Sequence, residues 1–283
     1  MAAAASLKPT DLAHRSKANV LIRKDDSGDL YRICIRYSSV SANNRYTLQN
    51  IDFIKKKVEP LIGSYLVHME LCTLPIASVT DCMEYLDIKC DIREVFTLKL
   101  PDLAPSTYDI IEVDHFTKFH LSPDKQIIIW ELKPKWLHQN TLFCRNCTHN
   151  SVKERDIDYC YASLMEDTNI LRELFKKYSL PTAFTMDMVR YFGSDENVLK
   201  LLYTVQERLN GYGSVASFGS AYEASEDLCL LMTLRDVTCF IRWEASSKID
   251  AKIIDVDLKP HDKWTHWVSE HRKIESFPSK TYH

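Results

Sequence analysis

The stretch from Gln126 to Trp136, QIIIWELKPKW, decides the predicted fold of this chain. Its apolar run, Ile127 to Trp130, is typical of a central strand that is buried on both faces. Side chains alternate between the two faces of an extended chain, so Glu131, Lys133 and Lys135 are predicted to share one face. The proline between the two lysines has no N–H to offer a sheet, and the strand is therefore predicted to stop there.

The two lysines that follow this strand are the first indication of a binding site. Lys133 and Lys135 repel each other at the mouth of a buried strand unless an anion lies between them. Their spacing therefore favours a site for a polyanion. Solvated lysines at an ordinary strand end fit the same spacing, so this stretch alone leaves both interpretations open.

The composition of the chain is that of a globular protein with a sizeable core. Of its 283 residues, 45% are hydrophobic and 27% are charged, as in ordinary globular domains. Its net charge of −3 gives no broad basic field, so we predict no direct binding of nucleic acid. No apolar run approaches the roughly 20 residues of a membrane span, and Ala2–Ala5 is too short for a signal-peptide core. We therefore expect an intracellular protein whose nine cysteines are reduced.

Two strands are predicted near the start of the chain, after a loose tail over residues 1–13. They cover Ala18–Arg23 and Leu30–Tyr37 and are joined by the turn-forming residues Asp25–Gly28. Arginines, among them Arg36, occupy one face of the second strand, as at the start of several nucleotide-binding lobes. An ordinary amphipathic hairpin fits the same residues, because the preceding loop lacks the glycines of a phosphate-binding loop.

The remaining elements follow from the spacing of apolar residues. Helices are predicted over Ile51–Leu61, Ser151–Met165, Leu171–Tyr178 and Val198–Leu209. Strands are predicted over Val95–Leu100, Tyr108–Val113, Leu228–Leu234 and Val237–Trp243. Polar or small residues predict loops over Ser38–Arg45 and Gly213–Glu226.

A pair of cysteines raises the question of a metal site. Cys144 and Cys147 form a C-x-x-C pair, and His138, His149 and Cys160 lie near it in the sequence. Zinc binds four such ligands in a tetrahedron. A second pair at the spacing of a zinc finger is missing, so we predict reduced structural cysteines here.

A second strand with a polar face is predicted near the end of the chain. From Ile254 the sequence IDVDLKP alternates, so Asp255, Asp257 and Lys259 are expected on one face. Neighbouring carboxylates repel each other unless a cation compensates them, and Mg²⁺ binds one or two carboxylates together with ligand phosphates. Solvated acids on an edge strand fit equally well. Together with the lysine pair, these acids describe the phosphate-rich cleft that phosphoryl transfer needs.

Five motifs follow one another along the second half of the chain. They are Glu131-Leu132-Lys133-Pro134-Lys135, Cys144 to His149, Lys153-Glu154-Arg155, Arg235 to Cys239, and Ile254 to Pro260. In this order the chain, over roughly residues 14–283, resembles the inositol-pentakisphosphate 2-kinase family and its fungal branch in particular. The resemblance implies an α+β fold of two lobes, distantly similar to protein kinases, with an ATP cleft between the lobes. Residues 14–122 would form the nucleotide-side lobe and residues 123–283 the inositol-phosphate-side lobe.

The resemblance also implies an activity. The family uses ATP and Mg²⁺ to phosphorylate the 2-hydroxyl of inositol 1,3,4,5,6-pentakisphosphate, which gives inositol hexakisphosphate (phytate). Five phosphate monoesters carry roughly −8 to −10 charges, which a lysine-rich clamp would balance. The resemblance further implies a monomer that acts on a small molecule in the nucleus. The alternative is a non-catalytic scaffold that binds inositol phosphates and has lost ATP turnover.

Particular residues receive roles through this resemblance. Asp236 matches the aspartate that meets the reacting hydroxyl, and Asp255 matches the one that holds Mg²⁺. The lysines that would clamp substrate phosphates are Lys133, Lys135, Lys153, Lys259 and Lys263. The nucleotide would be held by Ser16, Lys17, Ala18 and Asn19, by Arg36, and by Val113, Asp114 and His115 as the adenine hinge.

The chain departs from the family pattern in two places that concern its cofactors. The family's nucleotide loop is glycine-rich, whereas the loop here reads RSKAN over residues 15–19, and Lys17 would supply a side-chain contact instead. Plant and animal members carry structural zinc in an insert of the second lobe. No matching group of Cys and His lies between Gly211 and Leu228, so we predict no zinc.

Overall fold

The computed structural model describes residues 12–23, 28–210, 220 and 224–282. Most of the predicted tail lies outside these residues, but Leu12 and Ala13 belong to a strand. The predicted turn Asp25–Gly28 is described only at Gly28, and most of the predicted loop over Gly213–Glu226 lies outside the described residues.

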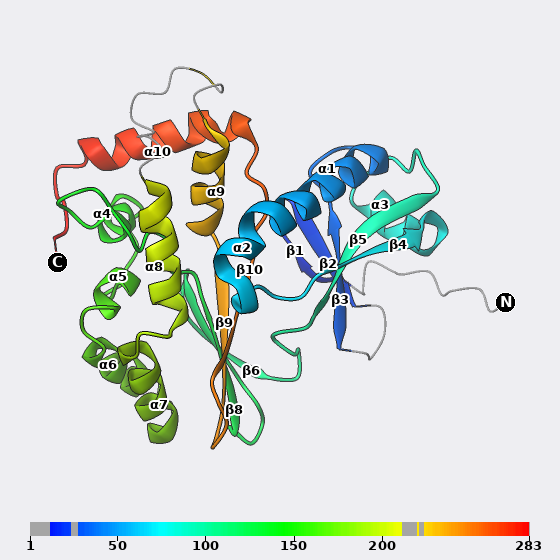
Figure 1. Ribbon diagram of the computed structural model, residues 1–283. Coiled ribbons are helices and arrows are strands. Elements are labelled where there is room, and N and C mark those ends of the chain that lie inside the picture. The colour runs from blue at the N-terminus through cyan, green and yellow to red at the C-terminus, as the bar shows by residue number, and fades with distance from the viewer. Residues whose placement is uncertain (1–11, 24–27, 211–219, 221–223, 283) are drawn as a thin grey trace. The chain divides into compact units, whose positions relative to one another are not determined.

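The chain divides into two compact units. The first comprises Met1–Lys56 and Val67–Pro105, and the second comprises Lys57–Leu66 and Ser106–His283. Each unit contains one five-stranded antiparallel sheet with helices around it, which confirms the predicted α+β class (Figure 1). The pair of β-strands at residues 109–121 belongs to the second unit, whereas the predicted lobes assign it to the first. The division into functional lobes stays a prediction.

The first unit is built on the strand order β1-β2-β3-β5-β4. The strands are β1 (Leu12–Arg15), β2 (Asn19–Arg23), β3 (Asp29–Cys34), β4 (Glu70–Pro75) and β5 (Glu94–Pro101). Helices α1 (Val40–Phe53) and α3 (Thr80–Tyr85) accompany them. Apolar side chains of β2, β3 and β5, such as Val20, Ile33 and Val95, form one core with Val40 and Met83 of the helices. The alternation of apolar residues thus predicted β2, β3 and β5 correctly.

The predicted loop over Ser38–Arg45 is wrong, because α1 begins at Val40. The Ser39 hydroxyl caps the helix by accepting from the N–H of Ala42, as serine commonly does at this position. Asn43 and Asn44 are 3% and 5% exposed, and their side chains bond to backbone groups outside the helix. The polar residues therefore serve buried hydrogen bonds and do not mark a loop.

The predicted helix over Ile51–Leu61 consists of three pieces. It begins as the end of α1, continues as a π-helical segment over Ile54–Val58, and ends as α2 (Glu59–Ile62). A proline stands at the start of α2, where its missing N–H costs no helical hydrogen bond.

The second unit has the strand order β10-β9-β8-β7-β6. The strands are β6 (Asp109–Asp114), β7 (Thr117–Leu121), β8 (Ile127–Leu132), β9 (Thr238–Glu244) and β10 (Asp250–Ile254). The predicted central strand is confirmed, because β8 lies in the middle of the sheet and ends before Pro134. Its side chains Ile128, Trp130 and Leu132 are fully buried.

Helices accompany this second sheet, and most of them lie on one side of it (Figure 1). They are α4 (Arg145–Val152), α5 (Tyr161–Leu164), α6 (Asn169–Lys177), α7 (Thr182–Gly193), α8 (Val198–Leu209), α9 (Glu226–Leu234) and α10 (Trp264–Ser276). The predicted helices over Leu171–Tyr178 and Val198–Leu209 are confirmed as α6 and α8. Among the described residues, no helix is both long enough and apolar enough to cross a lipid bilayer.

Three predictions for the second unit are wrong. Residues Leu228–Leu234 form helix α9, capped by Ser225, and not a strand; an apolar run of this length fits either element when it is buried. The predicted continuous helix over Ser151–Met165 is interrupted, because α4 ends at Val152, the backbone turns left-handed at Glu154, and α5 begins only at Tyr161. The predicted strand that starts at Ile254 also fails, since β10 ends at that residue.

Aromatic side chains form the densest part of the second core. Phe175 of α6 lies 5.2 Å from the ring centroid of Trp130 and 4.9 Å from that of Phe184, and none of the three rings is exposed. We expect Phe175→Ala to lower the free energy of unfolding by about 3–5 kcal/mol, because it removes buried area and leaves a cavity. Urea denaturation measures this loss. The matched control is Leu142→Ala, which removes a side chain that is 97% exposed and should change the value by less than about 0.5 kcal/mol.

Candidate active site

One edge of the second sheet gathers the predicted functional residues. Neighbouring strands of this sheet run antiparallel, so the last residues of one strand lie beside the first residues of the next. At this edge β6, β8 and β10 end, and β7 and β9 begin. The segments that leave this edge carry His115, Lys133, Lys135, Asp236 and Asp255. Residues far apart in the chain are thus brought together by strand pairing.

A pocket of about 380 Å³ opens beside this edge, within the second unit. Volumes of this order are typical of small-molecule sites. Seven of its lining residues are Lys or Arg, and two, Asp236 and Glu270, carry carboxylates. The cations are Lys133, Lys135, Arg145, Arg155, Arg235, Lys259 and Lys263. This excess of positive charge suits an anion with several charges.

At one side of the pocket, a single carboxylate joins two of the predicted lysines. The Nζ atoms of Lys135 and Lys259 each donate to a different oxygen of Asp236, both at 2.5 Å. Lys135 reaches it with a left-handed backbone, φ 60°. Burial acts to raise the pKa of Asp236, but the two ammonium groups outweigh it and lower the pKa to about 2. Asp236 is therefore ionised at neutral pH and holds both lysines at the pocket.

A second side of the pocket consists of two arginines stacked on Trp136. The guanidinium carbons of Arg145 and Arg235 lie 4.1 Å and 3.5 Å from the ring centroid of Trp136, which is cation–π geometry. Both arginines are nearly buried, at 6% and 5% exposure. Burial lowers the pKa of Arg145 to about 10, and burial and the charge of Arg145 lower the pKa of Arg235 to about 9. Both guanidinium groups therefore stay charged at neutral pH.

The partners of these two arginines are not carboxylates. Arg145 contacts Nδ1 of His271 at 3.2 Å, and Arg235 donates to Oδ1 of Asn210 at 3.0 Å. Within the described part of the chain, neither guanidinium has an ion-pair partner within 4.0 Å. Buried charges are normally paired, so this arrangement favours an anionic ligand as the missing partner.

Glu270 of α10 organises a third group of cations. It accepts from Lys153 at 3.0 Å, from Lys273 at 2.7 Å and from His149 at 3.2 Å. The hydrogen bond from Lys273 makes the largest contribution in lowering the pKa of Glu270 to about 2. Lys153 does not itself line the pocket, but this ion pair fixes it beside a lining residue.

The residues of the predicted motif Glu131–Lys135 lie in different environments. Lys133 and Lys135 line the pocket, as does Pro134. Glu131 instead pairs with His120 within the sheet, at 3.0 Å, and Leu132 is buried in the core. The expected shared face of Glu131 with the lysines is thus lost, because the strand ends between them.

The predicted substrate and metal residues nearby are placed as follows. Asp236, Lys259 and Lys263 line the pocket, whereas Asp255 does not. Asp255 is exposed, has a left-handed backbone (φ 61°), and accepts at 2.6 Å from the Thr238 hydroxyl. Asp257 is only 6% exposed. The predicted single face for these acids is wrong, because the left-handed residue breaks the alternation.

The predicted nucleotide loop belongs to the first unit, where it forms the turn between β1 and β2. The Ser16 hydroxyl accepts from the backbone N–H groups of Ala18 and Asn19, at 3.3 Å and 3.0 Å. Lys17 is exposed at the tip of this turn. Arg36, in the same unit, lies 4.7 Å from the ring centroid of Tyr46.

The predicted adenine hinge, Val113 to His115, lies in the hairpin between β6 and β7. Asp114 accepts from the Tyr159 hydroxyl at 2.5 Å and from the N–H of Phe116 at 2.6 Å. His115 lines the pocket, and burial, followed by the charge of Arg155, lowers its pKa. The whole segment belongs to the second unit, and its role as a hinge stays a prediction.

Comparisons with known proteins decide the family. A sequence model described as inositol-pentakisphosphate 2-kinase matches residues 194–273. A protein of that name from Saccharomyces cerevisiae is 39% identical over 273 residues, which span 95% of this chain and 97% of the relative. Proteins of the same name from Eremothecium gossypii and Candida glabrata are 36% and 34% identical, over 93% and 94% of this chain and 96% and 98% of their own lengths. The chain belongs to the inositol-pentakisphosphate 2-kinase family.

The predicted family is thus confirmed, and the site contains residues that the sequence analysis did not assign. Arg145 and Arg235 lie inside two of the quoted motifs, yet the resemblance gave neither of them a role. Arg155 adds a third guanidinium, 5.0 Å from the ring centroid of Phe116. Trp136 directly follows Lys135, so a tryptophan beside a basic pair was the available signal for stacking.

The Glu270 cluster predicts a specific dependence of stability on pH. A pKa lowered from 4.5 to about 2 means that ionised Glu270 stabilises the fold above about pH 4.5, and that this contribution is lost as the pH falls toward 2. We therefore expect Glu270→Gln to cost more free energy of unfolding at about pH 5.5 than at about pH 3. Urea denaturation of both proteins at the two pH values measures the difference. The control is Glu173→Gln, at an exposed position of α6. If its effect on the free energy of unfolding changed with pH as much as that of Glu270→Gln, the role of Glu270 would be contradicted.

Proposed function

We propose that this protein transfers the γ-phosphoryl group of ATP to the 2-hydroxyl of inositol 1,3,4,5,6-pentakisphosphate, giving the hexakisphosphate and ADP. The observation that carries the proposal is the pocket in which Asp236 joins Lys135 and Lys259 beside a surplus of cations. Its relatives in the family bear the name of this activity. The surplus suits a substrate with roughly −8 to −10 charges.

The cations of the pocket suit phosphate groups in two ways. Lysine carries a compact charge on a flexible side chain that can adjust to the position of the phosphate. Arginine has a planar guanidinium group that binds phosphate through two parallel hydrogen bonds. The guanidinium groups of Arg145 and Arg235 are held against Trp136 before any ligand arrives. Such preorganisation lowers the entropic cost of binding. We assign the substrate phosphates to both arginines and to Lys133, Lys135, Lys259 and Lys263, with Lys153 at the rim.

Asp236 has two roles in this proposal. Without substrate it compensates Lys135 and Lys259. When substrate phosphates draw these lysines away, the two charges that lower the pKa of Asp236 weaken, and the carboxylate becomes a better acceptor for the proton of the 2-hydroxyl. Asp236 then orients the hydroxyl oxygen toward the γ-phosphorus, and the lysines balance the charge that develops during transfer.

The nucleotide and its metal are assigned to other residues. Mg²⁺ commonly binds one or two carboxylates together with phosphate oxygens, and the exposed Asp255 fits this need because only one of its oxygens is bonded to Thr238. Bound Mg²⁺ would neutralise charge on the ATP phosphates. We propose that Ser16–Asn19, Arg36 and Val113–His115 contribute to ATP binding in a kinase-like cleft. Monomeric state and nuclear location complete the proposal through the family resemblance.

A non-catalytic scaffold is the second candidate, and the two aspartates argue against it. A binding protein for inositol phosphates gains from cations, but it loses affinity through carboxylates such as Asp236 and Asp255 near the same sheet edge. A transferase needs both carboxylates, one for the hydroxyl and one for the metal. The enzyme is therefore the interpretation in which both the cations and the two carboxylates have a role.

The function is tested by ATP-dependent conversion of the pentakisphosphate. We expect the wild type to form the hexakisphosphate and Asp255→Asn to lose the conversion by at least about 100-fold, because the metal carboxylate is gone. Ion-exchange chromatography of the products gives the rate, and calorimetry gives substrate affinity in parallel. A wild type that binds the pentakisphosphate but does not convert it would establish the scaffold instead.

Two further variants separate binding from chemistry. Asp236→Asn should lower kcat by about 10²- to 10⁴-fold with little change in KM. Lys133→Ala should raise KM by roughly 10- to 100-fold, the loss of one charge-assisted hydrogen bond, with kcat nearly unchanged. Lys248→Ala, which changes an exposed residue between β9 and β10 of the same unit, should match the wild type. An effect of Asp236→Asn on KM alone would contradict its assigned role.

A further inference from the structure

One side-chain amide connects two segments that carry residues of the pocket. Gln206 is a fully buried residue of α8, and no residue of this completely described helix lines the pocket. The amide oxygen accepts from the backbone N–H groups of Leu137 and His138, at 2.9 Å and 3.2 Å. The amide nitrogen donates to the carbonyl oxygens of Lys135 and Leu234, at 3.0 Å and 3.2 Å. Both donors and both acceptor positions of the amide are therefore used.

The first of these segments follows β8 and has no regular structure of its own. Residues 133–136 belong to no helix or strand, and Lys135 has a left-handed backbone with φ 60°. Such a backbone is unfavourable for a residue other than glycine and persists where the surroundings enforce it. Gln206 bonds to three backbone groups of this segment, and buried groups of this kind need partners. The amide therefore helps to hold the turn that brings Lys135 to Asp236.

The second segment begins where α9 ends. Leu234 is the last residue of this helix, and the carbonyl groups at a helix end have no partner within the helix. The carbonyl of Leu234 accepts instead from Gln206. Arg235 and Asp236 follow directly in the sequence. Helices α8 and α9 are in contact, so the bond fixes the start of the segment that carries both residues.

Two contacts of the pocket join these two segments. Lys135 donates to Asp236 at 2.5 Å, and the guanidinium carbon of Arg235 lies 3.5 Å from the ring centroid of Trp136. Each contact thus pairs a residue of the segment after β8 with a residue of the segment after α9. The buried amide of Gln206 is bonded to both segments, and it therefore limits the distance between the members of each pair.

We propose that Gln206 is a positioning residue, whose amide sets the distance of Lys135 and Trp136 from Arg235 and Asp236 in the pocket. Its effect on phosphoryl transfer rests on the proposed function, whereas the connection between the two segments does not. A displacement of about 1 Å in a group that takes part in a reaction can lower the rate about 100-fold. Loss of the amide should therefore impair both the binding of the inositol phosphate and its conversion, while the residues assigned to ATP are unaffected.

The same helix offers a matched control at its other end. Asn197 caps α8 and is 2% exposed. Its side-chain amide also makes four hydrogen bonds, and none of its partners lines the pocket. It accepts from the N–H groups of Leu199 and Lys200, and it donates to the carbonyl oxygens of Phe192 and Ser194. Replacing Asn197 should therefore destabilise the fold without moving the residues of the pocket.

Steady-state kinetics of Gln206→Met and Asn197→Leu test the role of the amide. For Gln206→Met we expect kcat to fall by about 10- to 100-fold and KM for the pentakisphosphate to rise by roughly 10-fold, with KM for ATP unchanged. For Asn197→Leu, kcat per folded molecule and both KM values should match the wild type. Urea denaturation gives the folded fraction of each variant. Wild-type constants for folded Gln206→Met, or an equal change in both variants, would overturn the proposal.

Hydrogen exchange tests the connection without catalysis and without a variant that must fold. In the wild type, we expect the side-chain amide protons of Gln206 to exchange at least about 100-fold more slowly than those of the exposed Gln49. Nuclear magnetic resonance of the ¹⁵N-labelled chain measures both rates. Equal rates in folded wild type would overturn the proposal.

A failure of the proposed function gives a different result. An inactive wild type would refute the kinase. The proposal for Gln206 would then be decided by exchange and by calorimetric affinity for the pentakisphosphate, which should be weaker in Gln206→Met and unchanged in Asn197→Leu. An affinity of folded Gln206→Met equal to that of the wild type would contradict it.

Discussion

Repulsion among cations is the constraint on which the pocket depends. The segments after β8, α9 and β10 all bring positive groups to one edge of a sheet, and like charges at close range disfavour the folded chain. The structure compensates them by three different means. Asp236 neutralises two lysines, Glu270 neutralises Lys153 and its neighbours, and the ring of Trp136 receives two guanidinium groups. What remains uncompensated is the charge that a polyanionic ligand would balance.

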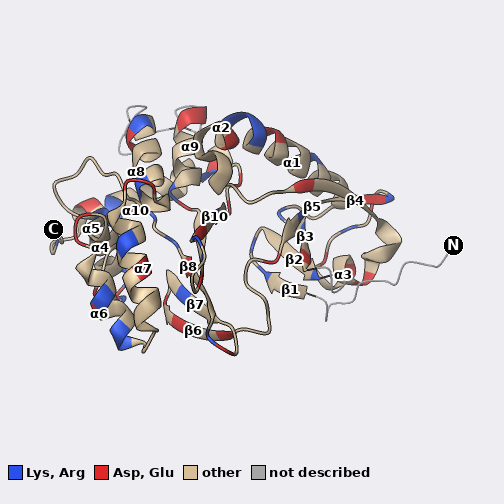
Figure 2. Cartoon of the chain, turned by 60° about the horizontal axis from the view of Figure 1, so that its bottom comes forward, with Lys and Arg blue, Asp and Glu red and all other residues tan. Residues whose placement is uncertain are grey.

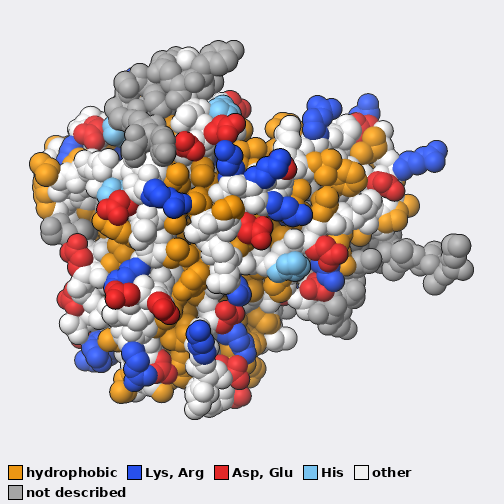
Figure 3. Space-filling model, in the orientation of Figure 1, with side chains coloured by type: hydrophobic (Ala, Val, Ile, Leu, Met, Phe, Trp, Pro, Cys, Tyr) orange, Lys and Arg blue, Asp and Glu red, His pale blue; other side chains and the backbone are white. Residues whose placement is uncertain are grey.

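This local surplus coexists with a net charge of −3 over the chain. Figures 2 and 3 show basic and acidic residues interspersed along the elements and on the visible face, without a block of one sign. Salt screens electrostatic interactions beyond about 8 Å at physiological ionic strength. A bound ligand is therefore affected by the charges of the pocket more than by the net charge of the chain. A small, highly charged ligand can therefore be selected without a general affinity for nucleic acids.

The sequence predicted the elements whose signal is local and missed those whose signal is not. The apolar run of β8 and the periodicity of α6 and α8 each reflect burial that is regular along the element. Helix α1 was missed because Asn43 and Asn44 are buried through bonds to residues 6 and 50 positions away. From Leu228 to Leu234, helix α9 is apolar at every position except Thr233, which removes the periodicity that separates helix from strand.

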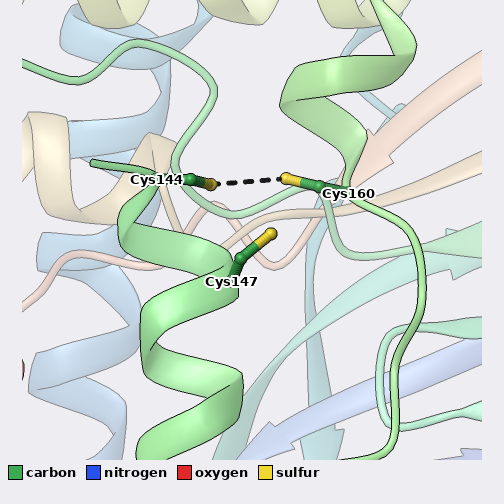
Figure 4. Close-up of side chains that lie close together, drawn as sticks. All are labelled: Cys144, Cys147 and Cys160. Carbon is green, nitrogen blue, oxygen red and sulfur yellow. Dashed lines mark hydrogen bonds between the residues drawn. The ribbon is translucent and has the colours of Figure 1, made fainter. Parts of the chain in front are cut away.

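The candidate site follows the same division between local and distant information. Lys133, Lys135, Lys259 and Asp236 were assigned because the family motifs gave them roles. Arg145 and Arg235 lie in motifs as well, but their importance comes from stacking on Trp136, which is a tertiary contact. Cys144 and Cys147 were judged by the missing second pair, yet the loop that ends at Cys160 brings a third sulfur within 4.8 Å of theirs (Figure 4). Sequence spacing indicates site residues that lie on one helix or strand, but it does not indicate residues that only tertiary contacts bring together.

The sheet edge explains why one aspartate faces the pocket and another does not. Asp236 precedes β9 and Asp255 follows β10, and the register places Ile254 opposite Thr238. Left-handed residues are costly, about 1–3 kcal/mol for a non-glycine residue, and persist where the surroundings enforce them. Here the bond from Thr238 holds the carboxylate of Asp255, and the left-handed turn directs it away from the face that its strand would have given it. In the proposed reaction, this separation would give the inositol phosphate one carboxylate and leave the other for the metal of the nucleotide, so the strand pair β9–β10 would serve both substrates.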